Sequence, residues 1–370
     1  SGEKYVKIKY RNFLFSEEIL NMIEKIKEQN VWDILKNDNK PVVLYGMGLG
    51  AEKIMDTLAQ YGIEVSDLFA SDEFVRGHSF RGYKVHKYSE ICEKYDDFNV
   101  VLCFASHIDS VIEHIEIIDS EHTVFAPDVP VAGGGLFSRE FVEENDEKFD
   151  FVYNRLADDE SKRVYLDILN FKVSGKIKYL LSSFADKDKI YSDILKLGDD
   201  EEIVDLGAYD GDTIREFCNA TSGKYKHITA FEPDAKNYKK LLKNTDSMEN
   251  ISCFNMGAWN KDDTLIFSTK AGRNSKLSAE GVSVKVKAID SLEIPATFIK
   301  MDIEGSEMKA LEGLERTITK YKPKLYVCAY HRNEDLYALP IKILELCENY
   351  TIYFRHSKYI PAWESNFYCV

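Results

Sequence analysis

Glycine and acidic residues gather in one short stretch, where their types and spacing could bind a nucleoside-like ligand. Residues 203–213 read IVDLGAYDGDT and residues 231–234 read FEPD, so Glu232 follows Gly211 by 21 positions. Glycine lets a ligand approach the backbone and permits a positive φ. A carboxylate at the end of the second strand can accept two hydrogen bonds from a ribose diol. The pattern is typical of one βαβ unit that holds a ligand at its first turn.

The first turn is rich in negative charge. Asp205, Asp210 and Asp212 would repel a pyrophosphate, but they fit a ligand with a cationic centre, such as S-adenosylmethionine with its sulfonium and ammonium groups. Thr213 opens the next helix and could hold the carboxylate of that ligand together with helix N–H groups. An ordinary strand–turn–helix with a solvated acidic loop is the alternative.

The composition narrows the class of protein. The chain has 370 residues, is 44% hydrophobic and has a net charge of −15, which argues against nucleic acid and anionic membranes as partners. It shows neither a long apolar run for a membrane span nor an apolar signal core. The seven cysteines are scattered along the chain and include no Cys-x-x-Cys pair, so we expect reduced thiols in a cytoplasmic protein. The eight histidines lack metal-ligand spacing, and no metal is predicted.

The first part of the chain predicts a helical segment, residues 1–40, and then a Rossmann-like domain, residues 41–130. The turn Gly46-Met-Gly-Leu-Gly-Ala51 and Asp72 after the next strand fit a dinucleotide fingerprint weakly. Three interpretations stay open: a domain that only packs or binds a partner, a nucleotide or nucleotide-sugar site, and a working NAD site.

The remainder predicts a linker and helical region at 131–195, marked by the Pro- and Gly-rich stretch 127–135, and a further domain at 196–370. Two strands at 350–355 and 366–370 close the chain, and such a hairpin on a parallel sheet is typical of methyltransferase folds. We therefore expect an α/β protein with two Rossmann-like units. The other strands expected in the second unit lie at 203–206, 227–231, 251–255, 297–302 and 324–330, with helices at 211–221, 234–245, 306–320 and 334–348 and a hairpin at 263–268 and 282–288.

Three strings carry a family resemblance. DLGAYDGDT at 205–213, FEPD at 231–234 and KMDIEGSE at 300–307 resemble the FkbM-type methyltransferases, over roughly residues 150–370. The resemblance implies a class I methyltransferase sheet, parallel except for a C-terminal antiparallel hairpin strand, and a cofactor, S-adenosylmethionine, that leaves as S-adenosylhomocysteine. These enzymes are most often assigned to O-methylation of sugars, polyketides or related metabolites. Residues 42–125 instead resemble small Rossmann-like domains found beside enzymes of polysaccharide biosynthesis.

The resemblance also implies where the cofactor lies. Its methionine end would meet the first turn, its ribose would meet Glu232, and its adenine would meet the backbone after the third strand. No acidic side chain near Asn255 supplies the usual contact to the adenine amino group. The implied binding residues are Asp205, Gly207, Ala208, Tyr209, Asp210, Gly211, Thr213, Glu232, Pro233, Asn255, Gly257 and Ala258.

Methyl transfer to an alcohol needs an aligned acceptor and the removal of a proton. Asp302 and Glu304 follow the fourth strand and His331 follows the fifth, at the edge where open α/β sheets place catalytic groups. We predict His331 as general base, since a histidine pKa lies near working pH, with Asp302 and Glu304 as catalytic carboxylates. Glu307 either faces the same cleft or caps its helix. A metal ion on Asp302, Glu304 and His331 is a chemical alternative, as are purely structural roles.

The sequence thus predicts a methyltransferase that acts on a hydroxyl of a saccharide or another small molecule. Two alternatives remain: an oxidoreductase or epimerase that uses NAD or a nucleotide sugar on residues 42–125, and a non-catalytic binding protein on a methyltransferase fold. The acceptor pocket is expected from segments 138–195, 269–281 and 356–366.

Overall fold

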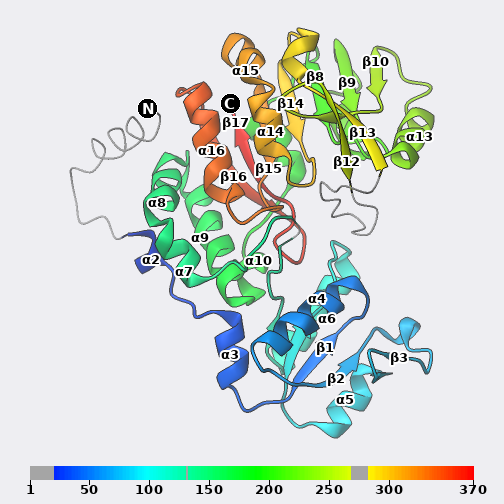
Figure 1. Ribbon diagram of the computed structural model, residues 1–370, viewed down its shortest axis with the longest axis vertical. Helices are drawn as coiled ribbons and strands as arrows, with labels where there is room; N and C mark the ends of the chain where they lie inside the picture. The colour runs from blue at the N-terminus through cyan, green and yellow to red at the C-terminus, as the bar shows by residue number, and fades with distance from the viewer. Residues whose placement is uncertain (1–20, 131, 268–281) are drawn as a thin grey trace.

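The computed structural model describes residues 21–130, 132–267 and 282–370, and the predicted acceptor segment 269–281 lies outside them. The chain forms two lobes: a smaller N-terminal lobe coloured blue to cyan, and a larger lobe coloured green to red (Figure 1). Helix α2 (Met22–Lys25) lies against the larger lobe, beside α7 (Arg139–Glu144) and α8 (Asp146–Arg155). Helix α3 (Val31–Asn37) instead packs its buried face on the smaller lobe.

The smaller lobe is a three-layer α/β unit. Its sheet has the order β3-β4-β2-β1-β5-β6, parallel except for the β3–β4 pair. Helices α3 and α4 cover one face, and α5 and α6 cover the other. The Rossmann-like expectation is confirmed. The elements are β1 (Val42–Tyr45), α4 (Leu49–Gln60), β2 (Val65–Phe69), β3 (Ser79–Phe80), β4 (Tyr83–His86), α5 (Tyr88–Lys94), β5 (Asn99–Leu102), α6 (Asp109–Glu121) and β6 (Val124–Phe125).

The larger lobe is built on a sheet of order β10-β9-β8-β14-β15-β17-β16-β7. Every pair of strands is parallel except those of β17, which runs antiparallel to both neighbours, as the sequence predicts. The strands are β7 (Phe184–Ala185), β8 (Glu202–Leu206), β9 (His227–Phe231), β10 (Ile251–Phe254), β14 (Phe298–Met301), β15 (Lys324–Cys328), β16 (Ile352–Ser357) and β17 (Ser365–Cys369).

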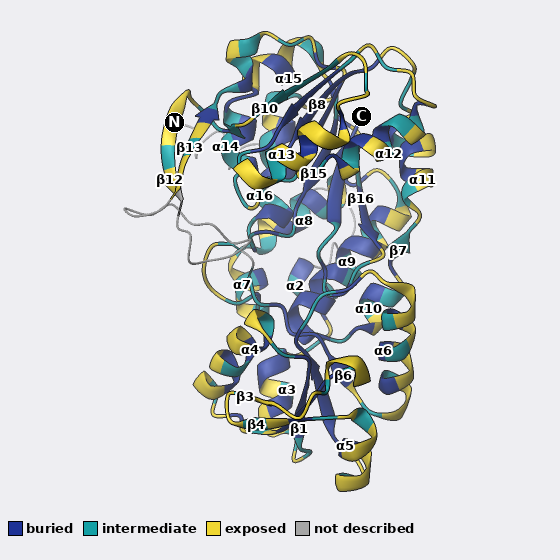
Figure 2. Ribbon diagram, turned by 90° about the vertical axis from the view of Figure 1, so that its right-hand side faces the viewer, coloured by how far each residue is buried: buried dark blue, intermediate teal, exposed yellow. Residues whose placement is uncertain are grey.

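Helices cover both faces of this sheet. One face is buried under α12 (Asp212–Ala220) and α13 (Ala235–Asn244), and the other under α14 (Glu307–Glu312), α15 (Glu315–Tyr321) and α16 (Asp335–Leu346). Figure 2 shows the strands as a dark buried centre and the outer faces of the helices as exposed. A separate small sheet joins β11 (Gly257–Ala258), β13 (Val282–Lys287) and β12 (Asp263–Phe267), which confirms the predicted hairpin.

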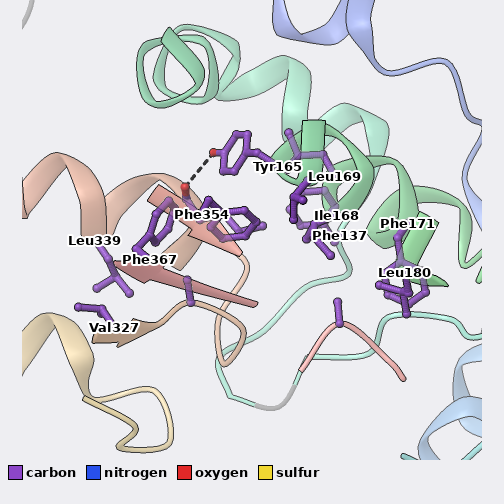
Figure 3. Packing of buried hydrophobic residues seen from close by; sticks show 14 of the residues in the cluster. Phe137, Tyr165, Ile168, Leu169, Phe171, Leu180, Val327, Leu339, Phe354 and Phe367 are labelled. Atoms are coloured by element: carbon purple, nitrogen blue, oxygen red, sulfur yellow. Dashed lines mark hydrogen bonds between the residues drawn. The ribbon is translucent and has the colours of Figure 1, made fainter. Parts of the chain in front are cut away.

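The helices before the larger sheet belong to its packing. Tyr165, Ile168 and Leu169 of α9 approach Phe354 and Phe367 of the C-terminal hairpin (Figure 3). The Tyr165 hydroxyl donates to the Leu336 carbonyl at 2.8 Å. Strand β7 extends the sheet beside β16. The domain boundaries stay predictions. The remaining elements are α7 (Arg139–Glu144), α8 (Asp146–Arg155), α9 (Asp159–Ser174), α10 (Lys178–Leu181), α11 (Lys187–Lys189) and a π-helical turn at Ile190–Leu195.

Buried and surface contacts join the two lobes. Lys172 of α9 pairs with Asp128, just after the smaller sheet, at 2.6 Å, and both side chains are buried. Ile360 in the β16–β17 loop exchanges backbone hydrogen bonds with Ser106, and its neighbour Lys358 pairs with Asp109 at 2.7 Å. The C-terminal hairpin therefore reaches into the carboxyl edge of the smaller sheet.

The cysteines agree with the expectation of unpaired thiols. All seven are free, with Cys103, Cys328 and Cys369 buried and Cys92 exposed. Among the described residues, no helix combines the length and apolar character that crossing a membrane would require.

Candidate active site

The strand ends of the larger sheet bring the predicted site residues to one edge. The turn after β8 touches the end of β9, because Gly207 N–H donates to the Phe231 carbonyl at 3.0 Å. It also touches the end of β14, because Lys300 Nζ donates to the Gly207 carbonyl at 2.9 Å. The parallel register of β8, β9, β14 and β15 thus produces the shared edge that the sequence predicts.

Glu232 is held in place by two backbone donors. Its Oε2 accepts from Tyr209 N–H at 2.9 Å and its Oε1 accepts from Asp234 N–H at 2.8 Å. Burial raises the pKa of this carboxyl to about 7, against the lowering effect of those two hydrogen bonds. Each oxygen keeps a second lone pair for a ligand hydroxyl, so the carboxylate is fixed in a suitable place for a ribose diol.

Asp205 has a different position from the one the resemblance implies. Its side chain is fully buried, where it lies 3.3 Å from Lys300 Nζ and accepts from the Thr213 hydroxyl at 2.6 Å. Burial lowers the pKa of Lys300, but the nearby charges of Asp205 and Asp302 raise it above its ordinary value. Asp205 therefore supports the turn from inside and ties it to the start of α12, instead of lining its surface.

The two glycines of the turn are explained by different features of the structure. A Cβ at Gly207 (φ +87°) would lie 1.8 Å from the Asp302 carbonyl oxygen, so the end of β14 requires glycine there. Gly211 has φ +89° and immediately precedes α12. Between them, Ala208 is buried and the Asp210 side chain is 28% exposed. Asp210 is thus a partly exposed carboxylate of this turn, and its Oδ1 lies 3.6 Å from the Arg215 guanidinium.

Asn255 supports the neighbouring turn after β9. Its Nδ2 donates to the carbonyls of Glu232 and Pro233 at 2.9 and 3.0 Å. Gly257 and Ala258 form β11, and a Cβ at Gly257 would lie 3.8 Å from the Pro233 ring. The adenine contacts implied for these residues remain predictions.

Carboxylates surround the buried imidazole of His331. Its Nδ1 lies 3.0 Å from Glu307 Oε1, and its Nε2 lies 3.4 Å from Asp302 Oδ1 and 3.7 Å from Glu304 Oε2. The Tyr330 hydroxyl donates to Asp302 Oδ1 at 3.1 Å. The structure therefore brings the three predicted catalytic residues together.

The charge state of His331 differs from the expectation. Burial lowers its pKa, but Glu307, Asp302 and Glu304 together raise it to about 10. The expectation of a pKa near working pH is wrong, because the sequence shows neither the burial nor the convergence of carboxylates. The imidazole is protonated at neutral pH in this form of the protein and cannot accept a proton there.

Two further acidic residues complete the cluster. Glu307 Oε1 accepts from Ile303 N–H at 3.0 Å, so this side chain both caps the turn and faces His331. Burial and the nearby charge of Glu307 raise the pKa of Asp335 well above its ordinary value. The sequence analysis did not identify Tyr330 or Asp335. The one available signal was position, since Tyr330 lies at the end of a predicted strand and Asp335 at the start of a predicted helix.

The segment between the lobes lies against this cluster. Ala132 N–H donates to the His331 carbonyl at 2.8 Å, and Asn333 Nδ2 donates to the Gly135 carbonyl at 3.3 Å. A Cβ at Gly305 would come within 2.8 Å of the Ala132 Cβ. The linker predicted from its glycines and prolines therefore also packs against the cluster.

The fingerprint of the smaller lobe has a packing explanation. A Cβ at Gly50 would lie 2.4 Å from the Cys103 carbonyl oxygen, and one at Gly46 would lie 2.6 Å from the Phe104 ring. The cavity at this edge has a volume of about 70 Å³ and is partly closed by Pro361 and Trp363 of the C-terminal hairpin. A nucleotide ligand on this lobe remains a prediction.

Comparison with known proteins agrees with this geometry. Residues 205–351 match the family described as Methyltransferase FkbM domain. The structure is similar to that of a methyltransferase FkbM from Methylobacillus flagellatus KT, with a TM-score of 0.70, 24% identity and 98% of each chain covered. At this identity the similarity shows a shared fold, and it extends over both lobes.

More distant structures share only part of the chain. Fibrillarin from Aeropyrum pernix, in complex with natively bound S-adenosyl-L-methionine, has 13% identity and a TM-score of 0.32 over 50% of this chain and 73% of its own. An rRNA methylase from Streptococcus thermophilus has 14% identity and a TM-score of 0.34 over 50% of this chain and 92% of its own. Scores this low support no argument about function. No curated protein matches the sequence. By the family match and the fold, residues 205–351 of this chain are an FkbM methyltransferase domain.

Proposed function

We propose that this protein transfers a methyl group from S-adenosylmethionine to a hydroxyl group of a saccharide or another small molecule. The observation that carries the proposal is the Glu232 carboxylate, which two backbone N–H groups fix beside the glycine turn. Asp302, Glu304 and His331 gather at the ends of β14 and β15, across β8 from Glu232. A carboxylate that can hold a ribose and a proton-accepting cluster at the same sheet edge make up the arrangement that this reaction needs.

The residues present fit the cofactor. Glu232 has a free lone pair on each oxygen for the ribose hydroxyls. The partly exposed Asp210, whose Oδ1 pairs with Arg215 at 3.6 Å, adds negative charge at the same turn, which suits an ammonium or sulfonium group. When bound, the sulfonium supplies an electrophilic methyl group, and S-adenosylhomocysteine is left as product.

The chain's own residues orient the acceptor and take its proton. Because His331 is protonated, the carboxylates of Asp302 and Glu304 are the proton acceptors, with side chains that are 28% and 49% exposed. The imidazolium, 3.4 Å from Asp302, favours negative charge on the reacting oxygen. Removal of the hydroxyl proton by these carboxylates would leave the acceptor oxygen to take the methyl group that the bound cofactor would supply.

The test uses the full chain with methyl-labelled S-adenosylmethionine and a panel of mono- and oligosaccharides. Label in a saccharide, together with an equal amount of S-adenosylhomocysteine, is the expected result, and Glu232→Ala should abolish both. Folded protein that binds neither S-adenosylmethionine nor S-adenosylhomocysteine at millimolar concentration would contradict the proposal. If the protein binds the cofactor but methylates only acceptors other than alcohols, the proposed substrate class would be wrong.

The other predictions rest on sequence alone. Cytoplasmic location, the absence of nucleic-acid and membrane partners, and the NAD or nucleotide-sugar alternatives for residues 42–125 remain predictions.

A further inference from the structure

We propose that the carboxylates around His331 bind one divalent metal cation, with Asp302, Glu304 and His331 Nε2 as ligands and Glu307 as the residue that orients the imidazole. Asp302, Glu307 and His331 each offer a ligand atom, and these atoms lie within 4.8 Å of one another. The inference deepens the proposed function and rests on it for its catalytic role, although metal binding can be measured without any methyl transfer.

The distances fit a metal centre on the Nε2 side of the ring. Two ligands at about 2.1 Å from a tetrahedral metal ion lie about 3.4 Å apart. His331 Nε2 is 3.4 Å from Asp302 Oδ1 and 3.7 Å from Glu304 Oε2, so each carboxylate lies at about the separation from Nε2 that a shared ion would give. On the opposite side, Glu307 Oε1 lies 3.0 Å from Nδ1. A carboxylate at that second nitrogen is the usual way in which metal-binding histidines are oriented.

The balance of charge also calls for a cation. Three carboxylates converge on one imidazole, so the cluster is negative even when the ring is protonated. Buried charges are stable only when they are paired. Glu307 Oε2, on a side chain that is 0% exposed, has no hydrogen-bond partner among the described residues. The guanidinium of the neighbouring Arg332 contacts other groups: it donates to the Gly305 carbonyl and lies 4.0 Å from Glu334.

The donor set favours a first-row transition cation. One imidazole and two carboxylates suit Mn²⁺ or Zn²⁺ better than Ca²⁺, which takes oxygen ligands. Asp302 and Glu304 are partly exposed, which leaves coordination positions that an acceptor hydroxyl can reach. A metal-bound hydroxyl loses its proton more easily. Binding of the cation displaces the Nε2 proton of His331 to solvent. With the cation bound, the carboxylates act as ligands and the proton of the acceptor hydroxyl passes to a solvent water.

The test measures metal binding by the full chain after treatment with a chelator. Free Mn²⁺ is followed by electron paramagnetic resonance, and Zn²⁺ by calorimetry. We expect one ion per chain and a loss of affinity of tenfold or more in Asp302→Asn and His331→Gln. Glu307→Gln should weaken binding by about 10- to 100-fold, as is typical for residues that orient a ligand. Glu312→Gln is the matched control, because Glu312 lies on the same helix but pairs with Lys309 and Asn260.

Two outcomes would overturn the proposal: folded wild-type protein that shows no saturable binding of Mn²⁺ or Zn²⁺, and binding that Asp302→Asn leaves unchanged. Asp302→Asn is the main variant, since that side chain is partly exposed and its loss should leave the fold intact. Calorimetry with S-adenosylhomocysteine on the same samples separates the two proposals. Cofactor binding without metal binding would refute only the metal proposal. Metal binding without cofactor binding would refute only the methyltransferase assignment.

Discussion

Replacing Glu232 with glutamine is expected to make the folded protein more stable relative to the wild type as the pH rises, while weakening cofactor binding. In the native protein this side chain is 6% exposed, and burial raises its pKa from 4.5 to about 7. Between those two pH values the folded state holds a proton that the unfolded chain has lost. The free energy of unfolding therefore falls as the pH rises through this range.

The size of the effect follows from the pKa. A rise from 4.5 to about 7 corresponds to about 3 kcal/mol, since each pKa unit is worth about 1.36 kcal/mol. About 2.5 kcal/mol of this is lost between about pH 5 and pH 8. Glutamine does not titrate, but its NH2 group cannot accept, so it loses one of the two hydrogen bonds from Tyr209 and Asp234 N–H at every pH. The stability of the variant relative to the wild type should therefore rise by about 2.5 kcal/mol between pH 5 and pH 8.

Urea unfolding followed by circular dichroism across that pH range measures the difference. Glu312→Gln is the control: partial burial raises the pKa of Glu312, but Lys309 and Asn260 lower it overall, so its removal should bring no gain at high pH. In parallel, Glu232→Gln should weaken S-adenosylhomocysteine binding near pH 8 by about 10- to 100-fold, the value of one hydrogen bond to a charged group. A relative stability that does not rise between pH 5 and pH 8 would refute the reasoning, because the hydrogen bonds of the carboxylate would then outweigh its burial.

Two further substitutions test the support of the glycine turn. Lys300→Met leaves the Asp205 carboxylate buried without its cation and should cost about 3–5 kcal/mol in urea unfolding; a cost below about 1 kcal/mol would show that the pair is dispensable. Gly207→Ala places a Cβ 1.8 Å from the Asp302 carbonyl oxygen and should prevent folding or cofactor binding, whereas Gly48→Ala, at a similarly positive φ but in open space, should cost only about 1–3 kcal/mol. Equal costs for the two alanines would contradict the close approach.

The sequence predicted most of the sheet, because short apolar runs bounded by turn residues mark buried strands. It missed β3, β7 and β11, since strands of two residues carry no periodic pattern, and β4, in which only Val85 is buried. It also predicted one helix over 306–320 where the structure has α14 and α15. The break follows Gly313, whose Cβ would lie 2.0 Å from the Trp259 carbonyl oxygen. That contact comes from a distant segment and leaves no local signal.

The candidate site, like the fold, was predicted only in part. Strand ends placed Glu232, Asp302 and His331 at one edge, because parallel strands share the direction in which they end. Residue type did not reveal that Asp205 faces inward, nor that Glu307 and its neighbours hold the His331 imidazole in its charged form. Such roles depend on burial and on charges from separate strands, which the order of residues does not specify.

Calorimetric titration of the full chain with S-adenosylhomocysteine tests the central claim most directly. We predict binding of one ligand per chain that is lost in Glu232→Ala, with Glu312→Gln binding as the wild type does. Folded wild-type protein that releases or absorbs no heat at millimolar ligand, with no rise in its unfolding temperature, would contradict the assignment of this edge to the cofactor.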